Sequence, residues 1–592
     1  MNTPIIIALY ACAVIGNSAI AQSSPAKLNG TPSADAVNAA LEANNHSRPK
    51  EASNVKVGRF LQAAISKQKT SQQVLESPFL TFKNDSRVQV YITLKDTSEQ
   101  SLTHLKEHSL IIEIENSSLN KIQGWVDIDK ISALSQLENV TRITAPTYSR
   151  AHAGRVTTQG DSILRANQLR NLGVTGKGVK VGIISDGASD WRTAANSGDL
   201  PNNITTYGSC TKRSADPQNC RSRLTCNEGT AMAEIIHDIA PDAELAVAAV
   251  STSLEFIQQI NRLANTFGAD IIVDDLGFYG EPYFEDGDLA RAVSSLPSNV
   301  LYFSSAGNAA NIHYERQYSA TSNSRHNFGS QSGGNDDAIG FSIGANRGAF
   351  VLLQWNDRYE QPNSNYDLFV FDQNSEIDNS TGSNTTAIEG TCIYNSSSTE
   401  AVRFAVIDKI SGSDRRLEMF FLGANAIEYP TPAGSVFGHA GTRRALAVAS
   451  INSDKSSVAF YSSRGPTRID YPSFENRAKP DMAATDGVSV TGAGGFPTTF
   501  FGTSAAAPHA AAVAAQLLSA SDDVTPQKVR SALLASASGG GGGSDVGSGR
   551  INAFAAFERL NVTISATDPS SPLSPEDKKK VITPILILLN DE

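Results

Sequence analysis

Short segments with strand-like and helix-like spacing alternate between residues 87 and 150. Apolar and polar side chains alternate as in a strand over residues 88–94, and the pattern changes to helical spacing over residues 98–107. The predicted strands are 88–94, 110–114, 121–126 and 140–144, and the predicted helices are 98–107 and 128–137. This order of strand, helix, strand, strand, helix and strand predicts a small α+β domain of the split βαβ type over residues 87–150.

A second pattern covers residues 155–320 and resumes over residues 431–560. Its predicted strands are short, continuous apolar runs at 179–186, 245–249, 270–273, 300–304 and 444–449. Helical stretches at 256–267, 505–518 and 526–537 separate or follow these runs. Strands that are apolar on both faces and alternate with helices predict an α/β domain with a doubly wound, mostly parallel sheet.

Residues 321–430 interrupt this α/β pattern. The segment is rich in Asn, Ser and Thr, and strand-like alternation recurs at residues 350–355, 366–371 and 401–406. Several short strands without intervening helices predict an all-β domain, of the sandwich type, inserted into the α/β domain.

The two ends of the chain lack such patterns. Residues 1–21 combine an apolar stretch with Ala19-Ile20-Ala21, the small-x-small pattern of a signal-peptide cleavage site, although a bare apolar anchor remains an alternative. A loose leader is expected over residues 22–86, and a linker with a short tail over residues 561–592. The apolar part of this tail, 581–589, is too short to cross a bilayer, so no transmembrane anchor is expected. The signal predicts a secreted or periplasmic protein.

Composition narrows the classes of function. The 592 residues are enough for several domains, and the formal net charge of −11, with no basic stripe, argues against a nucleic-acid partner. Beyond the leader the chain has Cys210, Cys220, Cys226 and Cys392. After export these four could form one or two disulfides in any of three pairings, and no suitably spaced His pair points to zinc.

The candidate nucleophile is Ser504, which follows Gly502-Thr503 at the start of the long small-residue stretch 505–518. A serine at the N-terminus of a buried helix lies beside free backbone N–H groups, and the helix dipole favours a developing oxyanion there. An ordinary core helix capped by Thr503 or Ser504 is the alternative for this motif alone.

The Gly-Thr-Ser stretch resembles the nucleophile motif of the subtilases, the subtilisin-type serine peptidases. Further stretches resemble that family's signature in its chain order, namely 183–187 with Asp186, 270–277, 304–308 with Asn308, and 461–467 followed by 479–484. The resemblance implies a subtilisin-type fold and a serine endopeptidase acting on polypeptides, with Asp186 in the triad and Asn308 in the oxyanion hole. It also implies that residues 87–150 are a propeptide-like domain over the cleft. No cofactor is required for the chemistry, and structural calcium is an option because calcium is common in the family.

The sequence departs from the family at the position of the catalytic base. The family motif is His-Gly-Thr, whereas this chain has Glu228-Gly-Thr. His237 cannot replace the missing imidazole, because on one helix it would lie about 180° round and roughly 13 Å along from Glu228. His509 matches a structural position of the family, and His439 and His152 match none.

A serine with glutamate and aspartate resembles the sedolisins, acid-acting relatives with the same fold. The match is partial, because Met232 stands where the second acid of a sedolisin helix is expected, and Asn308 stands where sedolisins place an aspartate. Carboxyl groups in contact share a proton, which raises one apparent pKa. The hypothesis is that protonated Asp186 donates to Glu228, and that Glu228 removes the proton of Ser504. Activity should then peak at acidic pH, because Glu is a weaker base than His.

Two points remain open at this stage. Asp274 and Asp275, at the end of a predicted strand, could favour basic substrate side chains, tune Glu228, cap a turn or bind calcium. The loss of the histidine also leaves a rival function, a catalytically dead subtilase scaffold that acts as a binding protein. A third function, an esterase using the same nucleophile, has nothing specific behind it.

Overall fold

A computed structural model describes residues 87–146, 150–151 and 159–562, except 222, 322, 330–333, 382–384, 454–456 and 540–542. Short pieces between residues 37 and 83 are described as well. The predicted signal (1–21) and the apolar tail (581–589) lie outside the described residues.

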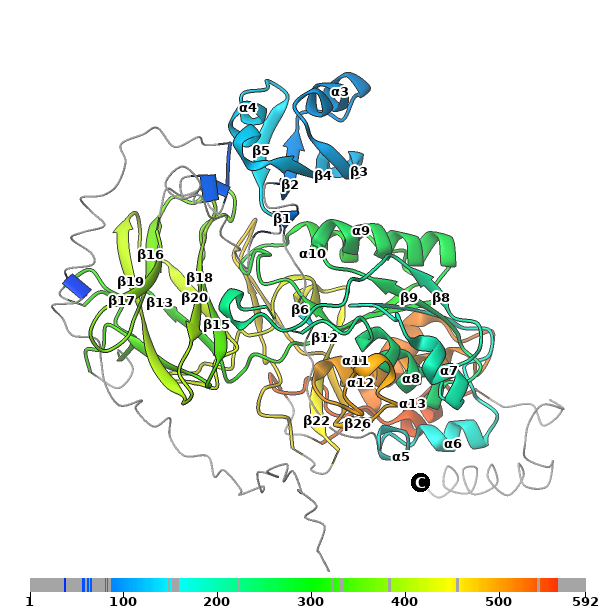
Figure 1. Cartoon of the computed structure of the whole chain (residues 1–592). Helices are drawn as coiled ribbons and strands as arrows, with labels where there is room; N and C mark the ends of the chain where they lie inside the picture. The colour runs from blue at the N-terminus through cyan, green and yellow to red at the C-terminus, as the bar shows by residue number, and fades with distance from the viewer. Residues whose placement is uncertain are drawn as a thin grey trace, which may run out of the picture.

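The N-terminal part forms an antiparallel sheet with two helices on it (blue to cyan in Figure 1). Its strands are β1 (Phe82–Lys83), β2 (Arg87–Leu94), β3 (Ile111–Asn116), β4 (Lys121–Asp127) and β5 (Val140–Thr144), and its helices are α3 (Glu99–Glu107) and α4 (Ile131–Ser135). Strand β2 pairs with β4 and β5, and β3 pairs with β4, which gives the split βαβ order. Helix α3 begins where predicted, because the Ser98 side chain caps it by accepting from the Ser101 N–H.

The packing of this N-terminal domain begins before residue 87. Val57 pairs with Ile143, and the Gly58 N–H donates to the Ile143 carbonyl at 2.7 Å. Leu61 and Leu80 are buried in the same core as the sheet. These described pieces of the segment expected to be a loose leader are therefore ordered parts of the domain.

The centre of the molecule is a seven-stranded sheet in the order β25-β22-β12-β10-β7-β9-β8, and every neighbouring pair is parallel. Its strands are β7 (Lys180–Ser185), β8 (Thr205–Tyr207), β9 (Glu244–Ala249), β10 (Ile271–Asp274), β12 (Leu301–Ser305), β22 (Leu446–Asn452) and β25 (Met482–Asp486). Strands buried on both faces account for the continuous apolar runs in the sequence.

Helices cover both faces of this sheet, which confirms the α/β prediction. Helices α8 (Glu228–Ile239) and α11 (Thr503–Leu518) pack on one face, where Val181, Val273 and Val448 are buried. Helices α12 (Pro526–Ser536) and α13 (Ala553–Arg559) join the same core. Helices α9 (Ser253–Arg262) and α10 (Asp288–Ser294) cover the opposite face, over Ile184 and Ile272.

Residues 313–427 form two further antiparallel sheets that share one hydrophobic core. The first contains β13 (His313–Gln317), β20 (Arg416–Leu422), β15 (Arg347–Trp355) and β18 (Ile388–Asn395). The second contains β17 (Glu376–Ser380), β16 (Asn365–Phe371), β19 (Ala401–Ser411), β14 (Ile339–Ile343) and β21 (Ala426–Ile427). We call this two-sheet unit the sandwich.

The sandwich lies beside the central domain, and the N-terminal domain lies over α9 and α10 (Figure 1). Aromatic and aliphatic side chains from both sides form the contact with the sandwich, including Tyr283, Phe350 and Phe420. A disulfide between Cys220 and Cys392 ties the central domain to β18. The N-terminal domain contacts α9 through Tyr91, whose hydroxyl lies 2.9 Å from the Ser253 hydroxyl.

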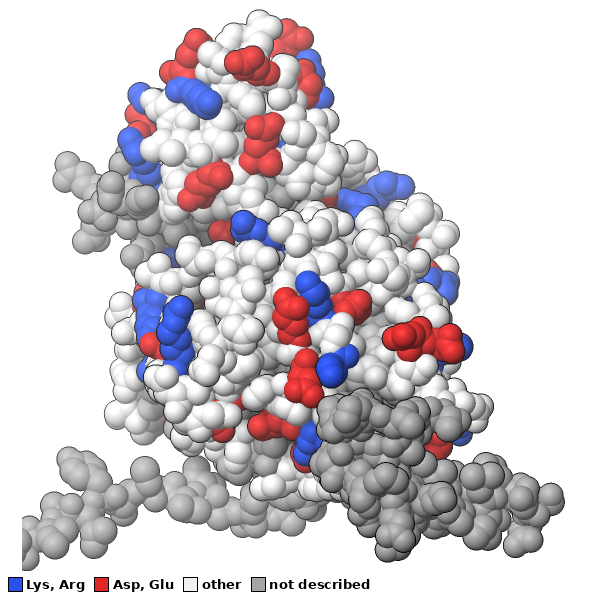
Figure 2. Space-filling view, turned by 90° about the vertical axis from the view of Figure 1, so that its right-hand side faces the viewer, with Lys and Arg blue, Asp and Glu red and all other residues white. Residues whose placement is uncertain are grey.

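On the face seen in Figure 2, acidic and basic side chains of the described residues are interspersed rather than gathered by sign. Within the described residues, no helix is both long and apolar enough to cross a membrane.

Candidate active site

Ser504 is the second residue of α11 and is fully buried. The preceding Gly502 has φ 102°, a backbone conformation that favours glycine. The turn at Gly502 starts the helix so that Ser504 lies in its first turn, where backbone N–H groups have no partner within the helix. The predicted nucleophile is therefore at a helix N-terminus, as the sequence indicated.

Asn308 lies next to this helix start. Its side-chain oxygen accepts from the Thr503 N–H at 2.9 Å and from the Thr503 hydroxyl at 3.0 Å. The Thr503 hydroxyl also accepts from the Gly307 N–H at 3.1 Å. These bonds fix the orientation of the Asn308 amide, with its NH₂ group directed away from Thr503. The predicted oxyanion donor is thus held beside the residue that precedes Ser504.

Asp186 lies directly after β7 and receives the N-terminus of α8. Its Oδ1 accepts from the Glu228 backbone N–H at 2.8 Å, and the backbones of Cys226, Asn227 and Gly229 also interact with it. Burial raises the pKa of Asp186 to about 6, against the lowering effect of these N–H groups. A carboxylate at a helix N-terminus is favoured by the helix dipole, so Asp186 anchors α8.

Close packing brings α8 to this anchor. A side chain at Gly229 would place its Cβ 2.7 Å from the Gly187 carbonyl oxygen and 2.8 Å from Val247. Only glycine fits at this approach, which explains why it follows Glu228.

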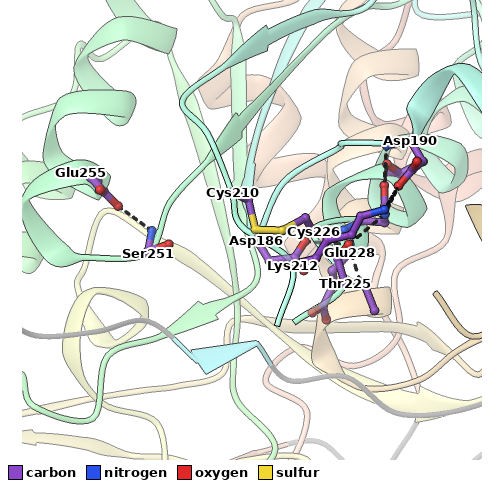
Figure 3. Close-up of a disulfide and its surroundings, with 11 residues drawn as sticks. Asp186, Asp190, Cys210, Lys212, Thr225, Cys226, Glu228, Ser251 and Glu255 are labelled. Atoms are coloured by element: carbon purple, nitrogen blue, oxygen red, sulfur yellow. Dashed lines mark hydrogen bonds and ion pairs between the residues drawn. A yellow bond between two sulfur atoms is a disulfide. The ribbon is translucent and has the colours of Figure 1, made fainter. Parts of the chain in front are cut away.

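The segment before α8 is fastened from two sides (Figure 3). A disulfide joins Cys210 to Cys226, two residues before Glu228, with the Cα atoms 5.7 Å apart. The Asn227 side chain donates to Asp190 at 2.8 Å and accepts from the Asp190 N–H at 2.8 Å. Together with Cys220–Cys392, this disulfide settles the pairing that the sequence left open.

Glu228 is buried, with 2 % of its surface exposed. The Ser504 hydroxyl and the Asp275 side chain both lie within hydrogen-bonding reach of its carboxyl group. Burial raises the pKa of Glu228 well above its usual value, and the neighbouring charges of Asp275 and Asp186 raise it further. The carboxyl group that replaces the expected histidine therefore faces the predicted nucleophile.

One predicted contact differs in the structure. The sequence-based hypothesis gave Glu228 a hydrogen bond from the protonated side chain of Asp186. Asp186 instead accepts from the Glu228 backbone N–H, and it acts on the Glu228 carboxyl group through its charge. The N-terminal N–H groups of α8 compete successfully for the Asp186 oxygens because they point at its carboxylate.

Asp275 is the group that sequence reasoning left undecided. It is fully buried beside Glu228, and burial followed by the charge of Asp186 raises its pKa well above the usual value. Its neighbour Asp274 belongs to a different environment and bonds to Tyr302 and His439. Consecutive residues of a strand point to opposite faces, and this alternation was the signal that could have separated the two aspartates.

A short strand lies next to this carboxyl group. Strand β11 (Leu276–Gly277) follows Asp275 directly and pairs antiparallel with β6 (Arg150–Ala151). Leu276 is opposite Ala151, and Gly277 is opposite Arg150. Backbone that follows the N-terminal domain therefore lies alongside the candidate site as an added strand.

The described histidines hold other positions. His237 is half-buried and lies in the last turn of α8, at the opposite end of the helix from Glu228. His509 is buried within α11 and bonds to the Ala505 carbonyl at 2.7 Å, and burial lowers its pKa to about 4. His439 bonds to Asp274 and Glu281. His152 lies outside the described residues.

Among the described residues, no group of three or more His, Cys, Asp or Glu side chains is arranged to hold a metal ion. Structural calcium therefore stays a prediction from the resemblance alone.

The model of the peptidase S8 group, described as the subtilase family, matches residues 395–554. The match shows that this part of the chain is similar to the subtilases. The matched residues include Ser504 but neither Asp186 nor Glu228, so the match bears on the part that carries the subtilase-type nucleophile.

Among solved structures, the chain is similar to the Clostridium perfringens CspB protease, with 13% sequence identity and a TM-score of 0.46. The similarity covers 68% of this chain and 99% of that one. No curated protein sequence matches the chain.

Proposed function

We propose that the protein is a secreted serine endopeptidase that cleaves polypeptides through an acyl-enzyme on Ser504. The subtilase match supports serine peptidase activity in general. The observation that carries the finer proposal is the Glu228 carboxyl group within hydrogen-bonding reach of the buried Ser504 hydroxyl. A serine hydroxyl needs such a base because it is a poor nucleophile at neutral pH.

In the proposed reaction, Glu228 removes the hydroxyl proton of Ser504 while the Ser504 oxygen bonds to the substrate carbonyl carbon. The carbonyl oxygen becomes an oxyanion, which is stabilised by the Asn308 amide and the N-terminus of α11. Glu228 then gives the proton to the departing amine, as a general acid. Asp186 couples to Glu228 by anchoring α8 and by its negative charge, which increases the proton affinity of the glutamate.

This arrangement is a sedolisin-like variation with a different spacing of the acids. The base is a carboxyl group, yet its burial and its acidic neighbours raise its pKa well above the usual value of a glutamate. The base therefore accepts a proton more readily than an exposed glutamate does.

The N-terminal domain is proposed to act as a propeptide over the cleft. It contacts α9 through Tyr91, whose hydroxyl accepts from the Leu254 N–H at 3.0 Å, and it contacts α10 through an ion pair of Lys121 with Asp288. The β6 backbone that follows this domain pairs with β11 as an extended substrate would, by addition of a strand. Export fits the two disulfides, which persist in oxidising compartments.

Labelling with a fluorophosphonate probe between pH 3 and pH 8 tests this function, with the Ser504→Ala variant as the control. We expect labelling of the full chain, or of its mature form, that is lost in the variant, followed by casein digestion with an acidic optimum. No labelling at any pH would favour the rival, a catalytically dead scaffold that binds polypeptides. Labelling without casein digestion would favour an esterase. An activity maximum above about pH 8 would contradict the carboxyl base.

A further inference from the structure

We propose that Asp275, rather than Asp186, is the positioning residue that shares a proton with Glu228. This inference rests on the proposed function and deepens it, because it names the partner that sets the pH range of the base.

Two strands and one helix bring the acidic side chains together. Strands β10 and β7 are parallel neighbours, with Asp274 opposite Ile184, so Asp275 and Asp186 both lie just past that register at the same sheet edge. Helix α8 begins at this edge with Glu228. Asp275, Asp186 and Glu228 have at most 5 % of their surfaces exposed.

Asp186 is already engaged by backbone N–H groups. It accepts the Glu228 backbone N–H at 2.8 Å and interacts with the backbones of Cys226, Asn227 and Gly229. A carboxylate that accepts several backbone N–H groups at a helix N-terminus favours its ionised form. A protonated Asp186 would lose these interactions, so it is a poor place for the shared proton.

Asp275 is in the opposite situation. Within the described residues, neither of its carboxyl oxygens makes a well-formed hydrogen bond, and neither does Glu228 Oε1. The groups that face it are the carboxyl groups of Glu228 on α8, Asp186 after β7 and Asp274 on its own strand, together with the Ser185 hydroxyl. No described Lys, Arg or His forms an ion pair with Asp275, which differs in this respect from Asp274. A buried carboxylate without a cation or an N–H donor is costly, and a shared proton removes that cost.

This assignment states which group holds each proton during the reaction. Before the chemical step, Glu228 is ionised, and protonated Asp275 donates a hydrogen bond to one Glu228 oxygen. The other Glu228 oxygen takes the Ser504 proton as the Ser504 O–H bond breaks and the bond from Ser504 to the carbonyl carbon forms. Asp275 keeps its own proton, and Glu228 returns the Ser504 proton to the leaving amine. No further reactant is needed.

The pH dependence of kcat/KM tests this assignment in the full chain. The wild-type profile rises as Glu228 ionises and falls as Asp275 loses its proton. We expect Asp275→Asn to lower kcat by ~10- to 100-fold with little change in KM, and to remove the falling limb, since an amide does not titrate. Asp186→Asn should lower the rate but keep both limbs. Glu234→Gln, a buried carboxyl group on the same helix that bonds to Thr491, is the matched control and should leave the profile unchanged.

A falling limb that persists in Asp275→Asn overturns the proposal, and so does a limb that is lost in Asp186→Asn. These outcomes differ from failure of the proposed function, which would appear as no probe labelling of Ser504 in the wild type.

A second measurement covers the case in which Asp275→Asn does not fold. In the Ser504→Ala protein with carbon-13 aspartate, infrared spectra at pH 7 should show a protonated aspartate carboxyl band. The band should persist when Asp186→Asn is added. Its absence, or its loss with that substitution, would overturn the assignment.

Discussion

Asp274 and Asp275 are consecutive residues at one strand end, and both are fully buried, yet their surroundings are opposite. Asp274 accepts from the Tyr302 hydroxyl at 2.5 Å, from His439 Nε2 at 3.0 Å and from the Leu276 N–H at 3.2 Å. The other nitrogen of His439 bonds to Glu281 at 3.3 Å. Burial lowers the pKa of His439, but Asp274 and Glu281 outweigh burial and raise it to about 10. Asp274 thus belongs to a buried ion cluster in which the protonated His439 is the cation.

Within the described residues, the groups that act on the pKa of Asp275 are three carboxyl groups and the Ser185 hydroxyl. Folding alone gives no reason to retain two buried carboxyl groups in contact, because a neutral side chain would avoid their repulsion. Strongly perturbed carboxyl groups beside a nucleophile are typical of functional sites. The comparison therefore distinguishes Asp274, which belongs to a buried ion cluster, from Asp275, to which the proposal assigns a role in the reaction.

The largest effect should follow from Glu228→Gln. The variant keeps the shape of the side chain but cannot accept the Ser504 proton, so kcat should fall by ~10³- to 10⁴-fold. Steady-state peptide cleavage measures this loss, and an unchanged circular dichroism spectrum would show that the fold is intact. Glu234→Gln serves as the control and should stay within a few-fold of the wild type. Near-wild-type activity of Glu228→Gln would remove Glu228 from the reaction.

Asp274→Asn should have the next largest effect, on stability rather than on chemistry. The substitution leaves His439 with one fewer anion in a buried site, and breaking such a pair costs about 3 kcal/mol. Urea unfolding of the Ser504→Ala background measures the free energy of unfolding without self-digestion. Equal stabilities of Asp274→Asn and Asp275→Asn would erase the distinction between the two aspartates.

His439 with Asp274, and Glu228 with Asp275, should change the free energy of unfolding over different pH ranges. The pKa of His439 is raised from 6.5 to about 10, so its contribution is complete below pH 6.5 and is lost as the pH rises to about 10. The pKa values of Glu228 and Asp275 are raised from 4.5 and 3.8, so their contributions begin to decline above those values. His439→Gln should flatten the stability curve between pH 6.5 and pH 10. An unchanged slope in that range would contradict a charged His439.

The smallest effect is expected for the stability of Asp275→Asn. An amide removes a buried acid whose ionised form is unfavourable, so the variant should be more stable than the wild type at pH 7 by about 1 kcal/mol. The gain should shrink toward zero near pH 4, where the aspartate of the unfolded chain also becomes protonated. Thermal melts at both pH values, in the Ser504→Ala background, test this. A loss of stability at pH 7 would indicate a structural role like that of Asp274.

Much of the fold could be predicted from local patterns. The continuous apolar run before Asp186 corresponds to β7, and the alternation after residue 87 corresponds to β2. Ser98 caps α3 at the point where helical spacing begins in the sequence. These features depend on neighbours in sequence, so they were visible without the structure. The packing of Leu61 and Leu80 into the N-terminal core was not, because isolated apolar residues in a polar segment give no periodic signal.

The residues of the candidate site could be predicted from the sequence, but the contacts among them could not. Ser504, Asn308, Asp186 and Glu228 could be found because each lies in a recognisable motif. The contact of Asp275 with Glu228 joins residues on different elements, and the competition of backbone N–H groups for Asp186 depends on how α8 approaches β7. Neither contact follows from sequence spacing. The alternation of Asp274 and Asp275 gave opposite faces, but not which face held the serine.

The two disulfides have a mechanical consequence. Cys392 of the sandwich is bonded to Cys220, and Cys226, a few residues further along the chain, is bonded to Cys210 beside Asp186 and Glu228. Any displacement of the sandwich would pull on the start of α8 through covalent bonds rather than through side-chain packing. Reducing the Cys220–Cys392 disulfide would remove the covalent link between the sandwich and this segment. The Cys210–Cys226 disulfide next to Glu228 would remain in place.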